Sequence, residues 1–346
     1  DLAGSVGVMD HKSFRDQHLS DLSNGLQGRV SGVSVQKNGQ PGSSAKIRIR
    51  GVNSVYRNNA PLYVVDGLVR ENGEAGIAPE DIESVQILKD ASSTAIYGSR
   101  GANGVILITT RKGKANQQNI SFDARMGFSN LVKKYEMLTP YQSALAYRDI
   151  KNPNAFTDAE MEGYKNGTKG IDWQDVFFGT GMTQDYKITI SKGSQHTQYY
   201  VSGRYNSEQG IVENNKSDKY QFKFNLTSEL TPWLHMTTDI IADHSDFTGS
   251  WFSTGPNPMF KALNYSPTME MQDKNGKYNW DPYNNIEANP MGEIRQAPSD
   301  SKANRMTGHV DLRFTILPGL TFTTTNGVDY FDGKNYSFGP TTVYRQ

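Results

Sequence analysis

The sequence contains no cysteine among its 346 residues. This absence excludes disulfides, thiolate metal sites and cysteine nucleophiles, and it gives no firm indication of the cellular compartment. No run of 18 apolar residues occurs, so the sequence predicts no membrane-spanning helix. Basic and acidic residues both number 36, so no net charge favours nucleic acid or an acidic partner.

Hydrophobic residues are also scarce, at 36% of the chain. The 18 tyrosines and 15 phenylalanines of the sequence argue against disorder as the reason. A wide membrane barrel explains the composition better, since only alternate residues face lipid and the lumen is polar. The chain starts at Asp1 without a signal peptide, and we therefore expect a mature or trimmed chain.

From residue 119 onward, apolar and polar residues alternate with a period of two, which is typical of β-strands. The clearest case is 220–227, where Tyr220, Phe222 and Phe224 lie on the face opposite Gln221 and Lys223. The expected strands, each about ten residues long, are 119–129, 185–190, 198–205, 220–227, 234–240, 305–316 and 320–330. Strands of a soluble β-sandwich are usually shorter.

Short turns at 193–195, 231–233 and 317–319 alternate with long polar loops between these strands. This arrangement is typical of outer-membrane β-barrels. About seven strands cannot close a wide barrel, and an open sheet edge is not tolerated in lipid. We therefore expect the chain to be an incomplete part of a longer barrel.

The first part of the chain has a different pattern, in which short strand-like segments alternate with short helix-like ones. This pattern predicts an α+β domain. Expected strands include 46–50, 61–65 and 105–110, and a helix is expected at 18–30. The predicted domains are residues 1–115 for this α+β unit and 116–346 for the antiparallel transmembrane barrel strands with long extracellular loops.

Four strings in the first domain carry a family resemblance. They are LQGRVSGVSV at 26–35, IRIRGVNSV at 47–55, PLYVVDG at 61–67 and DIESVQILKDASSTAIYGSRGANGVILITT at 81–110. Together they resemble the plug domain of SusC/RagA-type TonB-linked outer-membrane transporters, and the match covers nearly all of residues 20–112.

This resemblance implies a plug seated inside a wide, 22-stranded barrel in the outer membrane of a Gram-negative bacterium. It implies import of oligosaccharides or oligopeptides together with a SusD-like surface lipoprotein. It also implies a TonB complex that acts through an N-terminal segment ahead of the plug. The expected partners are thus this lipoprotein, TonB, the substrate and outer-membrane lipid, without nucleic acid.

Arg48, Arg50 and Arg100 are the candidate plug–barrel anchors. Arg48 and Arg50 could instead bind an anionic ligand, and Arg100 could pair within its own domain. We expect pairing with barrel carboxylates, because a bidentate arginine pair is stronger at a water-poor interface.

Two segments are candidates for substrate contact. The first is the polar plug loop with Tyr56, Arg57, Asn58 and Asn59, which would form the floor of the binding cavity. The second is the long outer loop 247–304, whose aromatic rings could stack on sugars or on apolar peptide side chains. Its candidate residues are Trp251, Tyr278, Trp280 and Tyr283. A self-packed loop core is the alternative.

The sequence offers no catalytic, cofactor or metal motif, and we expect a protein that is not an enzyme. Gly98, Gly101 and Gly104 fit a helix-to-strand connection and not a phosphate loop. Asp66 and Asp81 have local turn or helix-cap roles, and no serine lies in a GxSxG motif.

Two further motifs have simple structural interpretations. Residues 273–276 resemble part of a calcium loop, but the later ligands are missing and a hairpin turn fits better. The six histidines are scattered, without metal-ligand spacing.

Three functions remain open from the sequence. The first is a SusC-type importer, which the plug strings favour. The second is a siderophore or cobalamin receptor on the same scaffold, and the third is a soluble carbohydrate-binding β-protein. For a barrel, we expect Ser194, Pro232 and Pro318 on the periplasmic side, with the long loops near Lys151, Asn214 and Asn275 outside.

Overall fold

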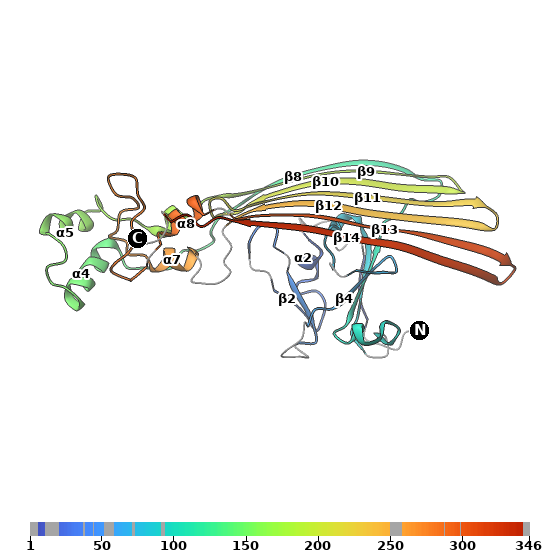
Figure 1. The fold of residues 1–346 in the computed structure, drawn as a ribbon, viewed down its shortest axis with the longest axis horizontal. Helices are drawn as coiled ribbons and strands as arrows, with labels where there is room; N and C mark the ends of the chain where they lie inside the picture. The colour runs from blue at the N-terminus through green and yellow to red at the C-terminus, as the bar shows by residue number, and fades with distance from the viewer. Residues whose placement is uncertain are drawn as a thin grey trace.

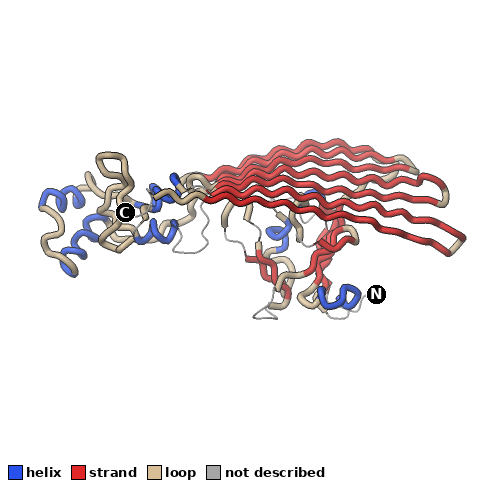
Figure 2. Tube along the Cα trace, viewed as in Figure 1, coloured by secondary structure: helices blue, strands red, loops and turns tan. Residues whose placement is uncertain are grey.

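Seven long strands form one curved sheet, and a smaller N-terminal domain lies beneath its concave face in the computed structural model (Figure 1). The structure describes residues 6–10, 21–36, 39–43, 45–51, 59–70, 73–90, 94–249, 258–286, 288–297 and 299–341. Helices and irregular loops gather at one end of the long strands, and short turns join them at the other end (Figure 2). In these ranges, no helix is long and apolar enough to span a bilayer.

The N-terminal domain contains a five-stranded sheet in the order β1-β6-β7-β4-β5 and a separate hairpin of β2 and β3. Its strands are β1 (Val6–Asp10), β2 (Val33–Gln36), β3 (Lys46–Ile49), β4 (Leu62–Val65), β5 (Leu68–Arg70), β6 (Ile82–Leu88) and β7 (Val105–Thr110). Its helices are α2 (Leu22–Leu26) and the 3-10 helices η1 (Pro79–Asp81) and η2 (Ala95–Gly101).

The core of this domain lies on both faces of β6 and β7. The first four residues of β7 are all apolar, as expected for a strand covered on two sides, whereas β6 has Glu83, Ser84 and Gln86 among its apolar residues. Leu22 and Leu26 of α2 pack in one cluster with Ile106, whereas Val64 and Val105 belong to a second cluster.

Two local predictions in this domain can be compared with the structure. The turn predicted at Asp66 and Gly67 is confirmed, with φ values of 49° and 90° that suit a two-residue type I′ hairpin. The helix predicted over 18–30 is shorter. Within the described residues it spans Leu22–Leu26, because Asp21 caps its start and the backbone is extended again at Gln27. Residues 18–20 lie outside the described ranges.

The long sheet, here called the wall, pairs its strands antiparallel in chain order. Its strands are β8 (Gln118–Ser129), β9 (Gly181–Gly193), β10 (Thr197–Gln209), β11 (Lys216–Thr231), β12 (Leu234–Thr248), β13 (Ser299–Leu317) and β14 (Leu320–Ser337). The predicted strands and short turns are confirmed. The expected length of about ten residues is wrong, since β8 has 12 residues and β13 has 19. The pairing continues past the apolar stretch into polar residues such as Asp218 and Asp246.

The two faces of the wall differ sharply in character. Polar side chains on the inner face are buried, and among them Lys187 is 4% exposed and Lys223 is 2% exposed. Apolar side chains on the outer face are open, and Phe122 is 68% exposed. This is the alternation that the sequence predicted, with the N-terminal domain covering the polar side.

The loops at the far end of the strands carry α4 (Pro140–Ile150), α5 (Asp158–Lys165), α6 (Trp173–Phe177), α7 (Pro258–Asn264) and α8 (Pro290–Gln296). Capping boxes define the starts of α4 and α5, where Thr139 and Thr157 exchange hydrogen bonds with Gln142 and Glu160. The loops therefore have ordered local structure of their own.

Candidate functional site

Asp81 of the N-terminal domain forms a deeply buried polar contact with the wall. It ends η1, directly before β6, and its side chain is 5% exposed. Its Oδ1 accepts hydrogen bonds from Lys187 Nζ at 2.6 Å and Tyr200 Oη at 2.7 Å. Its Oδ2 accepts one from Ser202 Oγ at 2.8 Å. Three side chains from β9 and β10 thus converge on one carboxylate.

The protonation of Asp81 follows from these contacts. Burial alone would raise the pKa of this carboxyl, but the charge of Lys187 and the three hydrogen bonds outweigh burial, so the pKa is lowered. Asp81 is therefore an anion at neutral pH, with its charge held by Lys187.

Glu80 extends the same contact. Arg125 Nη1 lies 3.1 Å from Glu80 Oε1, and Arg204 Nε lies 3.8 Å from Glu80 Oε2. Arg204 also forms a bidentate contact with Asp185 on the neighbouring strand. We call this group the Asp81 zone. Its members are Glu80, Asp81, Arg125, Asp185, Lys187, Tyr200, Ser202 and Arg204.

A second polar contact lies at the end of β7. Lys223 Nζ of β11 donates to Thr110 Oγ1, and Thr110 in turn donates to Asp66 Oδ2. Asp239 of β12 lies 3.4 Å from Lys223 Nζ and 3.9 Å from Lys112 Nζ. This contact joins the hairpin turn at Asp66 to the wall through a chain of charged and hydroxyl groups.

The arginines that the sequence suggested as anchors have different surroundings. Arg50 pairs with Asp90 of the same domain, and Arg48 and Arg100 are exposed. Their role in anchoring the domain to a barrel stays a prediction. The prediction of a local cap role for Asp81 is wrong, because its carboxylate binds Lys187, which lies 106 residues further along the chain.

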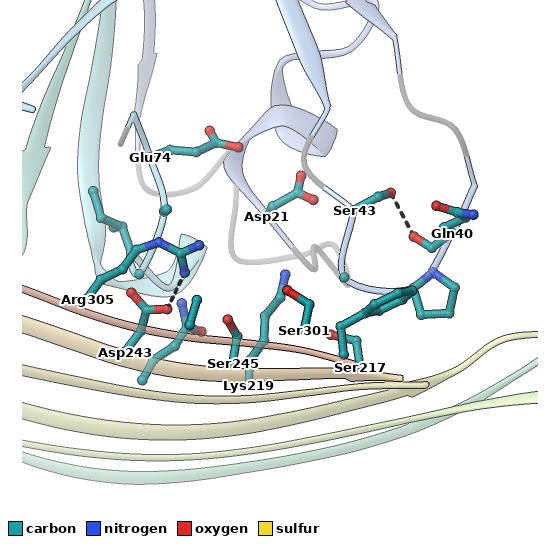
Figure 3. A pocket seen from close by; sticks show the side chains of 18 residues that line it. Asp21, Gln40, Ser43, Glu74, Ser217, Lys219, Asp243, Ser245, Ser301 and Arg305 are labelled. Carbon is teal, nitrogen blue, oxygen red and sulfur yellow. Dashed lines mark hydrogen bonds and ion pairs between the residues drawn. The ribbon is translucent and has the colours of Figure 1, made fainter. Parts of the chain in front are cut away.

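The wall cavity is a hollow of about 370 Å³ between the N-terminal domain and β11–β13 (Figure 3). Segments 39–43 and 73–77 form its upper side in Figure 3, and inward side chains of the wall form the lower side. Its lining residues are Asp21, Gln40, Pro41, Gly42, Ser43, Glu74, Ala75, Gly76, Ile77, Ser217, Lys219, Gln221, Asp243, Ser245, Phe247, Ser301, Ala303 and Arg305.

Two glycines hold the N-terminal domain close to the wall at this cavity. A Cβ on Gly42 would lie 2.2 Å from Ser217 Oγ, and one on Gly76 would lie 2.4 Å from Asp243 Oδ1. Both glycines have left-handed φ values, of 67° and 82°. Only glycine fits these close approaches without strain.

Glu74 faces the wall cavity from the N-terminal domain (Figure 3). Its Oε1 accepts hydrogen bonds from the backbone N–H and the hydroxyl of Ser23. Burial and the nearby charge of Asp21 raise the pKa of Glu74 to about 7, despite the opposing hydrogen bonds of Ser23. Glu74 therefore changes charge in the neutral range.

The outer loops enclose a second hollow, of about 500 Å³. Its lining includes Tyr135, Leu138, Trp173 and Tyr265, with polar groups such as Asn264 at the edge. Trp173 and Tyr265 have ring centroids 4.6 Å apart, and both are 3% exposed. Part of the lining of this hollow is therefore the closely packed ring pair of Trp173 and Tyr265.

The predicted substrate residues fall into three groups. Tyr56, Arg57, Asn58 and Trp251 lie outside the described residues, and Asn59 is half-buried. Trp280 is half-buried in the outer loop. Tyr278 packs against the cluster of Trp173, and Tyr283 lies 4.6 Å from Tyr147 between ring centroids. Contacts of the last two are those of a loop core, and a role in substrate contact stays a prediction.

The turn predicted near Asp273 is confirmed. Asp273 Oδ1 accepts hydrogen bonds from the backbone N–H groups of Asn275 and Lys277 at 2.8 and 2.9 Å. These bonds hold a hairpin tip and lower the pKa of Asp273. Across the described ranges, no group of three or more histidine or carboxylate side chains is arranged to hold a metal ion.

Neither the Asp81 zone nor the wall cavity is predicted by the sequence alone. The inward faces of β9 and β10 were recognised as polar, but the sequence gives no register between them and η1. A usable signal was the presence of Lys187 and Arg204 on a face predicted to be inward, because buried bases require acidic partners.

Comparison with known proteins supplies the family. Residues 1–105 match the TonB-dependent Receptor Plug Domain. The chain is 32% identical to the TonB-dependent receptor SusC of Bacteroides thetaiotaomicron, over 98% of this chain and 37% of that protein. It is 29% identical to TonB-dependent receptor P3 of Formosa agariphila, over 99% of this chain and 34% of that protein.

A solved structure agrees with these matches. The RagAB peptide importer in its closed-closed state superimposes with a TM-score of 0.82 at 25% identity, over 97% of this chain and 42% of that chain. The chain thus spans about a third of the length of the curated relatives it matches. These matches confirm the family resemblance and the fold predicted from the sequence.

Proposed function

We propose that the chain is part of a nutrient importer. It carries a TonB-dependent receptor plug domain, and 98% of the chain aligns with part of SusC. The importer takes up oligosaccharides or oligopeptides across the outer membrane of a Gram-negative bacterium. The N-terminal domain is its plug, and the wall is part of the barrel around it. A SusD-like surface lipoprotein and the TonB complex are the proposed partners.

The observation that carries this proposal is the plug-like domain docked on the polar face of an otherwise lipid-suited wall. The open outer face would be costly in water and is favourable in a bilayer. Oxygen and nitrogen atoms of the inner face instead meet Asp81, Glu80 and Thr110 of the N-terminal domain. A soluble β-protein would not need an open apolar face on one side of its sheet and a covered polar face on the other.

Two aromatic rows on the outer face support the membrane assignment. Tyr186, Tyr205, Tyr220 and His244 lie side by side near the loop end, with successive ring centroids 6.4, 5.0 and 6.1 Å apart. A second row lies near the short turns and contains Trp233, Phe314 and Phe322. Aromatic girdles at both interfaces are a feature of membrane barrels.

Import is tested by comparing cells with and without the full-length protein on a mixture of oligosaccharides and oligopeptides. The expected result is selective loss of uptake of one class, and the same loss when TonB is removed. Chromatography of the medium identifies what is consumed. Uptake that persists without TonB would contradict an energised importer, and unchanged uptake of both classes would contradict import of either.

Orientation has a separate test by cysteine labelling of the full-length protein, in which any cysteine outside these 346 residues is first replaced. With the short turns in the periplasm, Asn275→Cys should react with an impermeant maleimide in intact cells, and Ser194→Cys should react only after lysis. Labelling of Ser194→Cys alone in intact cells would reverse the orientation.

For substrate contact, we propose the plug loop around Tyr56, Arg57, Asn58 and Asn59 together with the aromatic outer loop. A stacked ring contributes on the order of 1 kcal/mol beyond its buried area. Joint replacement of Trp251, Tyr278 and Trp280 by alanine should therefore weaken binding by about tenfold or more. Unaltered affinity would place recognition elsewhere, such as on the lipoprotein.

A further inference from the structure

The wall cavity contains buried carboxylate oxygens that lack a donor. Glu74 Oε2 and Asp243 Oδ1 are buried and have no hydrogen-bond partner among the described residues. The other oxygen of each group is occupied, by Ser23 for Glu74 and by Arg305 Nη1 at 2.8 Å for Asp243. A buried acceptor without a donor costs about 1–3 kcal/mol. These oxygens therefore favour an occupant that donates hydrogen bonds.

The charges that line the cavity favour a cationic occupant. Three carboxylates line it, those of Asp21, Glu74 and Asp243, against the two cations Lys219 and Arg305, and Arg70 acts on Asp243 from outside the lining. The Arg305 guanidinium is already engaged, because it pairs with Asp243 and lies 5.2 Å from the centre of the Phe331 ring. The raised pKa of Glu74 has the same origin, since its carboxylate lies buried beside a second acid.

The rest of the lining fits a small polar group with an adjoining carbon chain. Ser217, Ser245 and Ser301 project from the wall toward the hollow, and Lys219 rises between them (Figure 3). Phe247 contributes an aromatic ring, whose face attracts ammonium groups. A volume of about 370 Å³ suits one residue or one sugar unit of a longer ligand.

We propose that the wall cavity binds a protonated primary amine through the carboxylates of Glu74 and Asp243. The amine supplies charge-assisted hydrogen bonds to these carboxylates. This inference rests on the proposed import function, because the amine belongs to the substrate. It could come from the N-terminus of a peptide or from an amino sugar, which share this chemistry.

Calorimetric titration of the full-length protein in detergent at pH 7.4 tests the site with two matched pairs of probes. One pair is trialanine and N-acetyl-trialanine, and the other is glucosamine and N-acetylglucosamine. The free amine of one pair should bind at least about tenfold more tightly than its acetylated form, a difference of about 1.4 kcal/mol. The pair that shows this difference identifies the source of the amine.

Variants locate the binding. Glu74→Gln keeps the shape of the side chain and removes its charge. It should lower the affinity for the amine by about tenfold or more. Ser245→Leu fills the hollow without changing a charge and should weaken it as well. Glu83→Gln is the matched control, because Glu83 lies on β6 with its side chain 45% exposed and does not line the cavity. This control should bind as the parent does.

Several outcomes would overturn the site. They are equal affinity for free and acetylated probes, no binding of any probe, or binding that neither Glu74→Gln nor Ser245→Leu changes. Equal affinity within the sugar pair, with no difference within the peptide pair, would show that hydroxyl groups are the ligand instead. Since the titration needs no TonB energy, its failure is separate from a failure of the uptake test, which concerns import alone.

Discussion

The Asp81 zone and the wall cavity are two regions of the same interface that are built in opposite ways. In the Asp81 zone, Lys187, Tyr200 and Arg204 fill the space between wall and N-terminal domain, and each oxygen of Asp81 has a donor, although Glu80 Oε2 has none among the described residues. At the wall cavity, small inward side chains such as Ser245 and Ala303 leave a hollow beside larger ones such as Arg305, and Glu74 Oε2 and Asp243 Oδ1 lack donors in the described part of the chain. Side-chain size on the wall thus determines where the N-terminal domain is clamped and where room remains.

The largest expected effect is at the ion pair between Asp81 and Lys187, here called the clamp. Asp81→Ala leaves Lys187, which is 4% exposed, buried without a hydrogen-bonded counter-charge. The loss in the free energy of unfolding of the N-terminal domain should be about 3–5 kcal/mol. Urea-dependent maleimide reactivity of a reporter at Ala78→Cys in the full-length protein measures it, because Ala78 is 1% exposed; any cysteine outside these 346 residues is first replaced.

The control for this prediction is Glu83→Ala, whose half-exposed side chain lies 3.9 Å from Lys114. It should cost less than about 1 kcal/mol. If Asp81→Ala costs no more than this control, the clamp does not hold the domain.

The next effect concerns pH at the wall cavity. The pKa of Glu74 is raised from 4.5 to about 7 in the folded protein, so the folded state binds more protons between these values. Its contribution to stability is therefore present below pH 4.5 and is lost as pH rises to 7. Glu74→Gln should match the parent at pH 4.5 and exceed it at pH 8, by on the order of 3 kcal/mol at most.

The same urea titration, repeated from pH 4.5 to 8, gives this difference directly. Other titrating groups cancel, because the variant and the parent share them. A difference between the two proteins that does not change with pH would show that Glu74 keeps an ordinary pKa.

A smaller effect is expected from close approach. Gly76→Ala places a Cβ 2.4 Å from Asp243 Oδ1 and adds strain at a φ of 82°. Gly67→Ala is the matched control, since its φ is 90° and nothing lies within 4 Å of the added carbon. Both carry a strain of about 1–3 kcal/mol, and the excess for Gly76→Ala reports the clash. Equal costs would mean that the turn at 73–77 moves freely from the wall.

The smallest effect is expected for an exposed ion pair in the loops. Arg295 Nη2 lies 2.8 Å from Glu213, with side chains 38% and 45% exposed. Arg295→Ala should cost less than about 1 kcal/mol, and less still in high salt. A thermal unfolding series at two salt concentrations checks this. A loss as large as that of Asp81→Ala would remove the contrast between buried and exposed pairs.

Much of the fold was predictable because alternation along a strand encodes two faces at once. The inward and outward sides of β11 follow from Phe222 and Lys223, and the short turns follow from Pro232 and Pro318. These are local signals that need no knowledge of the partner strand.

The contacts between the two parts were not predictable in the same way. Asp81 looks locally like a helix-cap residue, and its bond to Lys187 depends on how two distant segments pack. Arg50 has an acidic partner at Asp90 in its own domain, which local sequence did not suggest. The wall cavity arises only when Ser217, Ser245 and Ser301 from three strands face two glycine turns.

A double-mutant cycle between Asp81 and Lys187 tests the clamp most directly. The variants are Asp81→Asn, Lys187→Met and the combination, each carrying the Ala78→Cys reporter. If the ion pair holds the N-terminal domain on the wall, the combination should cost at least about 1.5 kcal/mol less than the two single changes added together. Costs that add within about 0.5 kcal/mol would contradict the clamp.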